Sequence, residues 1–199
     1  MGLKYKKVDK IMNVYDFDKT IYSGDSTTAF FLFSLKRHPS VLCLIPSVFY
    51  GFIKYYVFKK GTKTQFKQRI MYFVKKIDYK KDIADFWKKN KGKIKKYYID
   101  QKKETDVIIS ASPAFVIEPV CKELGIKNII ASPVDVKTGE YTGENCHGKE
   151  KVRRFREVFG NCEIHEFYSD SYSDTPLAEI AEKAYMVKGD KVSPWIFKD

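Results

Sequence analysis

Cysteine and histidine are scarce in this chain of 199 residues, which has four cysteines and three histidines. The cysteines are widely spaced, and no two of them form a C-x-x-C pair. That spacing indicates neither a zinc site nor a disulfide framework, so we expect reduced thiols and a cytoplasmic protein. Residues 1–7 are basic, but no apolar run of signal length follows them. We therefore expect no secretion signal.

Acidic residues are scarce in one part of the chain. Residues 54–103 contain 18 Lys and Arg against four Asp, while the whole chain has a formal net charge of +12. The basicity belongs to this region, which we expect to face an anionic partner. Lysines alternate with aromatic residues there, as at Lys95-Lys96-Tyr97-Tyr98, so a nucleic-acid-binding module is one alternative. Because the lysines recur at helical spacing, the other alternative is that they form only a solvated helix face. We expect no nucleic-acid partner.

Short apolar runs alternate with helical patterns at the two ends of the sequence. Continuous runs rich in Ile and Val are typical of parallel strands covered on both faces. Repetition of strand and helix indicates a doubly wound sheet. We predict an α/β fold with a doubly wound, mainly parallel, Rossmann-like sheet. The expected strands are 11–15, 106–110, 128–132, 164–169 and 184–187; the expected helices are 114–124, 150–159 and 176–183, and 135–141 is expected to form a hairpin.

A helical insertion separates the first expected strand from the second. Residues 24–99 are helical in pattern, aromatic and rich in lysine. A βαβ crossover needs far fewer residues than this. We therefore predict a catalytic core made of residues 1–23 and 100–199, and an inserted α-helical cap made of residues 24–99.

The predicted cap contains a nearly continuous apolar run at residues 41–58, interrupted by Pro46, Gly51 and Lys54. A helix that spans a bilayer needs about 20 mostly apolar residues, so this run is marginal in length. A buried or membrane-surface helix pair is favoured over a span. A run that forms only the cap's own core is the third alternative. Any membrane contact is expected to be peripheral, at the inner face of the membrane.

The most informative motif is Asp16-Phe17-Asp18-Lys19-Thr20, which follows the first expected strand. Side chains alternate faces along an extended chain, so Asp16 and Asp18 can point the same way and divide nucleophilic and acid/base work. An ordinary β-turn with solvated acids is the alternative.

Polar residues also follow the later strands, where ligands bind in open α/β sheets. Ser110 and Ala111 precede a helix whose first N–H groups can bind an anion. Lys149 lies at a helix start, where a cation does not favour the helix dipole. Asp170 and Asp174 follow the fourth expected strand. These acids and the first pair would repel one another at one sheet edge, and Mg2+ together with a lysine would compensate them.

The order D-x-D-x-T, then Ser, then Lys, then D-S-x-x-D-x-P resembles the haloacid dehalogenase superfamily of phosphatases. The resemblance covers the whole core. An insertion between the first two motifs is similar to that of the phosphoserine phosphatase subclass. The resemblance implies a Mg2+-dependent phosphomonoester hydrolase that forms an aspartyl-phosphate intermediate. The presence of Asp18 argues against the dehalogenase branch, which lacks an acid at that position.

The resemblance also implies a role for the residues of the first motif. Asp16 is the nucleophile, and Asp18 is the general acid and then the general base. Thr20 helps to hold the loop. Mg2+ is bound by the carboxylates of Asp16 and Asp170 and by the backbone carbonyl of Asp18.

The later motifs are implied to grip the phosphoryl group. Ser110, Ala111 and Lys149 bind its oxygens, and Asp174 orients Lys149. One departure from the phosphoserine phosphatases is Ser173, because those enzymes have an Asn before the corresponding acid.

The cap bears on the substrate, and two classes stay open. Phosphoserine phosphatases use an acid just after the first motif to hold the substrate amine; Asp25 stands near that place, where it is equally suited to be an N-cap. The apolar run with Pro46, together with Gly148-Lys149-Glu150-Lys151-Val152, is more similar to the phosphatidylglycerophosphate phosphatases of the superfamily. We therefore expect a membrane lipid phosphate such as phosphatidylglycerophosphate as substrate and an anionic phospholipid surface as partner. A small soluble metabolite like phosphoserine is the alternative.

Overall fold

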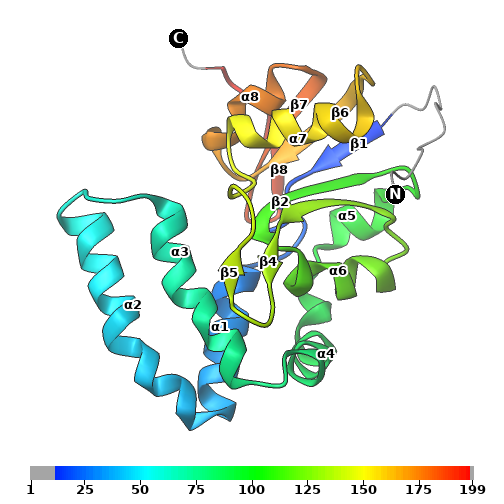
Figure 1. The fold of residues 1–199 in the computed structure, drawn as a ribbon. Coiled ribbons are helices and arrows are strands. Elements are labelled where there is room, and N and C mark those ends of the chain that lie inside the picture. The colour runs from blue at the N-terminus through cyan, green and yellow to red at the C-terminus, as the bar shows by residue number, and fades with distance from the viewer. Residues whose placement is uncertain (1–11, 198–199) are drawn as a thin grey trace.

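A six-stranded sheet forms the centre of the molecule in the computed structural model, which describes residues 12–197 (Figure 1). The strand order is β3-β2-β1-β6-β7-β8. All neighbouring pairs are parallel except the last, in which β8 runs antiparallel to β7. This confirms the predicted fold class; Ile11, the expected first strand residue, lies outside the described residues. The strands are β1 (Met12–Tyr15), β2 (Val107–Pro113), β3 (Asn128–Ser132), β6 (Ile164–Ser169), β7 (Ala181–Lys188) and β8 (Lys191–Pro194).

Helices cover both faces of the sheet because the buried strand residues alternate between two apolar clusters. Val14 and Ile109 belong to the cluster beneath α7 (Lys149–Phe159) and α8 (Thr175–Ala178). Their neighbours Tyr15 and Ile108 belong to the other cluster, with α5 (Lys96–Gln101) and α6 (Ala114–Glu123). The carboxyl ends of the parallel strands are thereby left open between the two helical layers.

The expected helix over 176–183 is wrong in its second half. Helix α8 ends at Ala178, and Ala181 and Lys183 already pair with β6, opposite Ile164 and Glu166. The stretch has good helix formers, but the ladder with the buried β6 outweighs that local preference. Strand β8 was not expected, because its four residues, KVSP, carry too little pattern to mark a short edge strand.

Two helices of the insertion are built into the main body. They are α1 (Ser26–Arg37) and α4 (Tyr79–Asn90), which pack on α6. Phe30 and Trp87 are buried in the same cluster as Tyr15 of the sheet. The indole N–H of Trp87 donates to the carbonyl of Val116 in α6, at 2.6 Å. These parts of the insertion therefore share one core with the sheet.

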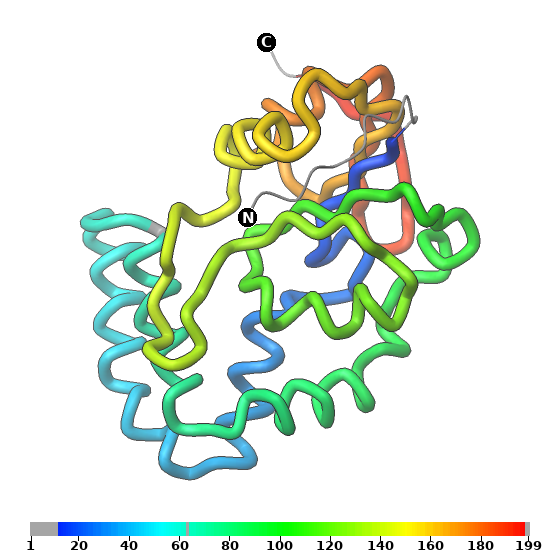
Figure 2. The backbone as a smooth tube through the Cα atoms, turned by 45° about the vertical axis from the view of Figure 1, so that its right-hand side comes forward, coloured from blue at the N-terminus to red at the C-terminus, as the bar shows by residue number. Residues whose placement is uncertain are grey.

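A helical arm, residues 39–71, projects from this body beside the hairpin (Figures 1 and 2). Pro39–Val57 is one continuous helical run of 19 residues, of which only 11% is buried. Of the expected buried or membrane-surface helix pair, the burial and the break into two helices are wrong: Pro46 lies in the first turn of α2, where a missing N–H costs nothing, and no break follows it. The membrane-surface location stays a prediction. The arm consists of a 3₁₀ turn η1 (Pro39–Leu44), α2 (Ile45–Phe52), a π-helical turn η2 (Ile53–Val57) and α3 (Lys63–Met71). After the arm, η3 (Tyr72–Lys76) leads to α4, and η4 (Lys91–Lys93) leads from α4 back toward the sheet.

The expected hairpin over 135–141 is confirmed by the pair β4 (Val134–Asp135) and β5 (Glu140–Tyr141). It packs on the arm through Gln68 of α3. The Gln68 amide donates to the Gly139 carbonyl at 2.6 Å, and the Tyr141 N–H donates to Gln68 Oε1 at 2.9 Å. The hairpin thus fixes the inner side of α3.

Gly139→Ala should destabilise the protein by about 1–3 kcal/mol. Gly139 has φ +71°, and a Cβ there would lie 2.7 Å from the carbonyl oxygen of Met71, which is backbone and cannot turn aside. Gly125→Ala is the matched control, because Gly125 has φ +78° and open space around the added Cβ. Urea unfolding should show a larger loss for Gly139→Ala than for Gly125→Ala; equal losses would mean that the close approach carries no cost.

Candidate active site

The acids expected from the sequence meet at the carboxyl edge of the sheet. Asp16 follows β1, and Asp170 follows β6. They share a cavity of about 200 Å³ with residues from β2, α7 and the arm. The lining residues are Asp16, Asp18, Lys19, Asp25, Lys67, Ser110, Ala111, His147, Lys151, Asp170, Ser171, Ser173 and Asp174.

Asp16 is buried and bonded through both carboxylate oxygens. Oδ1 accepts from the Lys151 ammonium at 2.6 Å, and Oδ2 accepts from the Thr20 hydroxyl at 3.3 Å. Burial raises the pKa of Asp16 to about 7, with a smaller upward contribution from Asp174, while Lys151 lowers it. The carboxylate is therefore held in one orientation at the mouth of β1.

The lysine of the site is Lys151, and the expectation for Lys149 is corrected by this geometry. Lys149 is the first residue of α7 and its side chain is exposed. Lys151 is only 1% exposed, and its Nζ lies 2.6 Å from Asp16 Oδ1 and 2.7 Å from Asp174 Oδ2. Burial disfavours the ammonium, but the two carboxylates outweigh it and raise the pKa of Lys151.

A signal for this lysine was present in the sequence. Lys151 lies four residues before Phe155, which is fully buried, so the two share the inward face of α7. Lys149 falls outside that spacing. The helical spacing from Phe155 identifies Lys151 as the lysine that faces inward, whereas position at the helix start does not.

Asp174 completes the buried ion group, although its partner is Lys151 and not Lys149, which the resemblance implied. Its Oδ2 accepts from Lys151 and also from the Ser169 hydroxyl at 2.7 Å. Its Oδ1 is buried without a hydrogen-bond partner among residues 12–197. Ser169, the last residue of β6, was not singled out from the sequence.

Asp18 has different partners from Asp16, although both line the cavity. Its Oδ1 accepts from the Ser26 N–H at 2.7 Å, and its Oδ2 accepts from the Ser112 hydroxyl. Burial raises the pKa of Asp18 to about 6, and Asp25 adds to the shift. Ser112 was missed by the sequence reasoning; its only signal was a second serine two residues after Ser110.

Asp25 confirms the N-cap interpretation of its place after the first motif, and its contact with a substrate amine stays a prediction. It is the N-cap of α1, and its Oδ1 accepts from the Thr28 N–H at 2.7 Å. It also lines the cavity. Capping occupies one of its oxygens, so a contact with substrate would use the other.

The end of β2 and helix α3 close another side of the cavity. The Ser110 hydroxyl is buried and accepts from the Ser112 N–H at 3.1 Å. From the arm, the Lys67 ammonium donates to the Ala111 carbonyl at 3.0 Å and to Asn145 Oδ1 at 3.3 Å. Lys67 was missed because nothing in the sequence distinguishes it from the other lysines of the arm.

The donors suited to a divalent cation are Asp16, Asp170 and the backbone carbonyl of Asp18. Burial raises the pKa of Asp170 as well, while Lys19 and Lys188 lower it. Residues 12–197 contain no group of three or more His, Cys, Asp and Glu side chains placed to hold a metal. The third protein ligand would therefore be the carbonyl, and carboxylate and carbonyl oxygens are the donors that Mg2+ takes.

Comparison with known proteins decides the family. The family of haloacid dehalogenase-like hydrolases matches residues 14–179. The chain belongs to this family. The matched range contains every residue of the site described above, from Asp16 to Asp174.

Two sequence relatives of this hydrolase match over part of their length. Protein CicA of Caulobacter vibrioides is 36% identical over 88 residues, which is 41% of this chain and 40% of that protein. A probable phosphatase of Mycobacterium tuberculosis is 33% identical over 92 residues, 43% of this chain and 32% of that protein. The matches thus span less than half of these relatives.

Solved structures share the fold of the haloacid dehalogenase-like chain. A Bordetella pertussis protein of unknown function has a TM-score of 0.69 at 18% identity, covering 87% of this chain and 88% of that one. A phosphoserine phosphatase in its apo form has a TM-score of 0.56 at 16% identity, covering 88% and 84%.

Proposed function

We propose that the chain is a phosphomonoester phosphatase that works through an aspartyl-phosphate on Asp16. The observation that carries the proposal is that two carboxylates in one cavity have different hydrogen-bond partners. Asp16 is fixed between Lys151 and Thr20, while Asp18 is held separately by Ser26 and Ser112. A nucleophile that must be charged and an acid that must carry a proton need such different surroundings.

The first half of the reaction forms a bond from Asp16 to phosphorus. An Asp16 oxygen attacks in line, the ester bond on the opposite side breaks, and the leaving oxygen takes the proton of Asp18. The Lys151 ammonium lowers the pKa of Asp16, which favours the anion, and it offsets the negative charge of the transferring phosphoryl group. The hydroxyl of Ser110 and the backbone around Ala111 are placed to bind the phosphoryl oxygens from the β2 side.

The second half hydrolyses the aspartyl-phosphate. Asp18, now anionic, takes a proton from water, whose oxygen attacks phosphorus; Asp16 leaves as a carboxylate, and inorganic phosphate is released. Asp16, Asp170 and the Asp18 carbonyl would hold Mg2+. When bound, Mg2+ neutralises charge on the transferring phosphoryl group.

For the substrate we propose a membrane lipid phosphate of the phosphatidylglycerophosphate type. The support is that one helix, α3, brings Lys67 into the cavity and also belongs to the exposed apolar arm. Asp25 beside the cavity keeps a small amine-bearing metabolite such as phosphoserine as the second candidate. A turnover panel of micellar lipid phosphates and soluble phosphomonoesters, with and without Mg2+, tests the proposal. Mg2+-dependent release of phosphate from the lipids is expected, and release from phosphoserine alone would replace the lipid by the metabolite.

Asp18→Asn should slow turnover of alkyl phosphates by about 10²–10⁴-fold. The amide oxygen can still accept from the Ser26 N–H, and the amide NH2 can donate to Ser112 Oγ, but the amide has no acidic proton to give to a poor leaving group. An aryl phosphate with a good leaving group should still phosphorylate Asp16, giving a burst followed by slow hydrolysis. Because the reactive form has Asp16 anionic (pKa about 7) and Asp18 protonated (pKa about 6), the wild-type rate with alkyl phosphates should peak between pH 6 and 7 and fall above it. This alkaline fall should disappear in the variant. Equal losses for both substrate types would contradict the acid role.

A further inference from the structure

The arm carries an exposed apolar stripe. Phe49 is 61% exposed and Leu42 50%, values far above those of the core. The exposed residues recur at intervals of three and four, which places them on one side of a helix. On the opposite side, buried Gly51 faces Phe66 and Arg69 of α3. The stripe is open to solvent; its members are Leu42, Ile45, Phe49, Phe52 and Tyr56, with Val57 and Phe58 at the tip. The rings of Phe52 and Tyr56 also contact Phe66 of α3.

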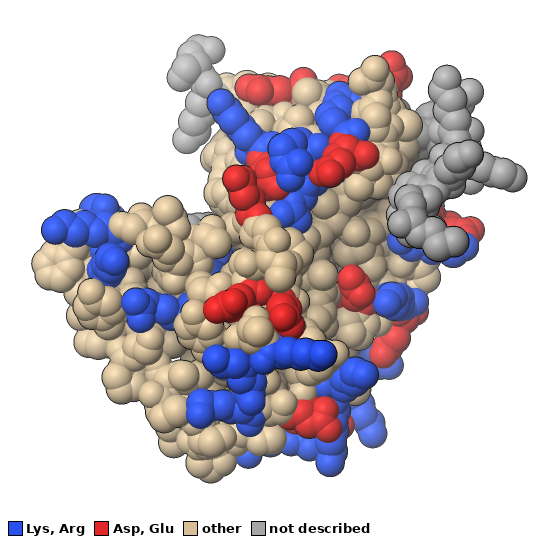
Figure 3. All heavy atoms as spheres, in the orientation of Figure 1, with Lys and Arg blue, Asp and Glu red and all other residues tan. Residues whose placement is uncertain are grey.

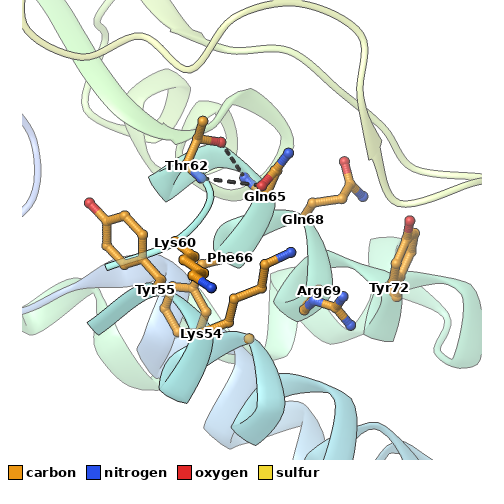
Figure 4. Close-up of a pocket in the computed structure, with 10 residues that line it drawn as sticks. Lys54, Tyr55, Lys60, Thr62, Gln65, Phe66, Gln68, Arg69 and Tyr72 are labelled. Carbon is orange, nitrogen blue, oxygen red and sulfur yellow. Dashed lines mark hydrogen bonds between the residues drawn. The ribbon is translucent and has the colours of Figure 1, made fainter. Parts of the chain in front are cut away.

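A cationic groove lies between the arm's two helical segments (Figure 4). It has a volume of about 450 Å³, and no acid lines it. Lys54 extends from η2 toward Arg69 of α3, and Lys60 lies at the tip. The Arg69 guanidinium is held by the Ser47 hydroxyl at 2.9 Å and lies over the Tyr50 ring, 5.1 Å from its centroid. The groove thus offers cations without an acid in its lining, and the Arg69 guanidinium contacts only neutral groups there, the Ser47 hydroxyl and the Tyr50 ring.

The charge of the whole region is of one sign. Between Asp25 and Asp78 the sequence contains no acid and ten Lys and Arg. Figure 3 shows blue and tan but no red over the arm. An apolar stripe set among cations complements a surface that is apolar below and anionic above. A second copy of the arm would bring cations against cations, so self-association does not suit it.

The run Pro39–Val57 is long and apolar enough to span a membrane. The adjacent helix α3 is too short for such an arrangement. Helix α3 packs antiparallel beside it and returns the chain to the hairpin through Gln68. With nine residues, α3 covers only about 14 Å, less than half of a hydrocarbon core of about 30 Å. A chain that crossed along Pro39–Val57 could not come back along α3. The arm can lie on a membrane with this packing intact.

We propose that the arm docks on the surface of a bilayer that contains anionic phospholipids. The stripe lies at the boundary between headgroups and acyl chains, and the groove cations bind lipid phosphates. This proposal stands apart from the proposed phosphatase activity, since binding to vesicles requires no turnover.

Co-sedimentation with vesicles tests the docking. The full chain should bind phosphatidylcholine vesicles containing phosphatidylglycerol at least tenfold more strongly than vesicles of phosphatidylcholine alone. Ile45→Ser with Phe49→Ser should lower this binding at least tenfold, as should Lys54→Gln with Arg69→Gln. Phe49→Trp should show a blue-shifted emission that is quenched by brominated lipid. Thermal melts establish that each variant is folded.

Matched controls lie at the other end of the molecule. Ile196→Ser with Phe197→Ser removes exposed apolar side chains, and Lys183→Gln with Lys191→Gln removes two exposed cations. Both should bind vesicles like the wild type. The proposal is overturned by equal binding to neutral and anionic vesicles, by no loss in the arm variants, or by no quenching at position 49. Salt-sensitive polynucleotide binding without vesicle binding would instead assign the basic surface to nucleic acid.

Discussion

Asp16→Asn should reduce turnover by on the order of 10⁴-fold or more, because it removes the carboxylate that attacks phosphorus in the first half of the reaction. The amide has nearly the shape of the carboxylate, and its carbonyl can still accept from Lys151. The fold should therefore persist, with a melting temperature near that of the wild type. Rapid acid quenching with labelled substrate should yield a base-labile acyl phosphate from the wild type and none from the variant.

The covalent readout separates the nucleophile from a merely structural acid. An acid that only oriented other groups would leave a labelled intermediate at reduced rate. A labelled Asp16→Asn protein, or steady-state activity within tenfold of the wild type, would falsify the assignment. Asp25→Asn is a useful comparison, since it changes another carboxylate of the same cavity and should leave the acyl phosphate intact.

Lys151→Met should be the most damaging substitution for both activity and stability. It leaves Asp16 and Asp174 buried together without their cation, a situation that costs about 3–5 kcal/mol when one partner of a buried ion pair is removed. Lys149→Met is the matched control: the same change, two residues earlier on an exposed side chain, should leave activity and melting temperature nearly unchanged.

The pH dependence of Lys151→Met follows from Asp16. Without the ammonium, the pKa of Asp16, already raised by burial, rises further above that of the unfolded chain. An acid with a raised pKa contributes stability at low pH that is lost as pH rises. The melting temperature of the variant should therefore lie closer to that of the wild type at pH 5 than at pH 8. A deficit independent of pH would point to lost packing of the lysine stem instead.

The sequence predicted most of the sheet and the acids of the site because both depend on local pattern. Strands such as Asn128–Ser132 and Ile164–Ser169 are apolar runs with clear ends, and strand ends place their following residues at one edge of the sheet. Asp16, Asp18, Asp170 and Asp174 could be placed on that ground, and all four line one cavity.

What could not be predicted depends on contacts between distant segments. The strand character of Ala181–Lys183 comes from pairing with β6, and Lys67 reaches the cavity only because the hairpin docks on α3. Lys149 was preferred over Lys151 because position at a helix start was weighed above the inward face of the helix. The burial of the nearby Phe155 shows that the inward face of the helix is the criterion that decides.

Because α1, α4 and the sheet share one core, residues 24–99 are not a separable module of this protein. Excising residues 24–99 as a unit would strip the aromatic residues that cover Tyr15 and Ile108, and the remaining strands would face water on one side. The arm joins this core at its two ends, where Val41 and Met71 are fully buried, and it contacts the body through Lys67 and Gln68. A graft that changes what this hydrolase meets at its surface should therefore exchange residues 45–66 alone, and keep these contacts and the helices before and after the arm as part of the sheet's own packing.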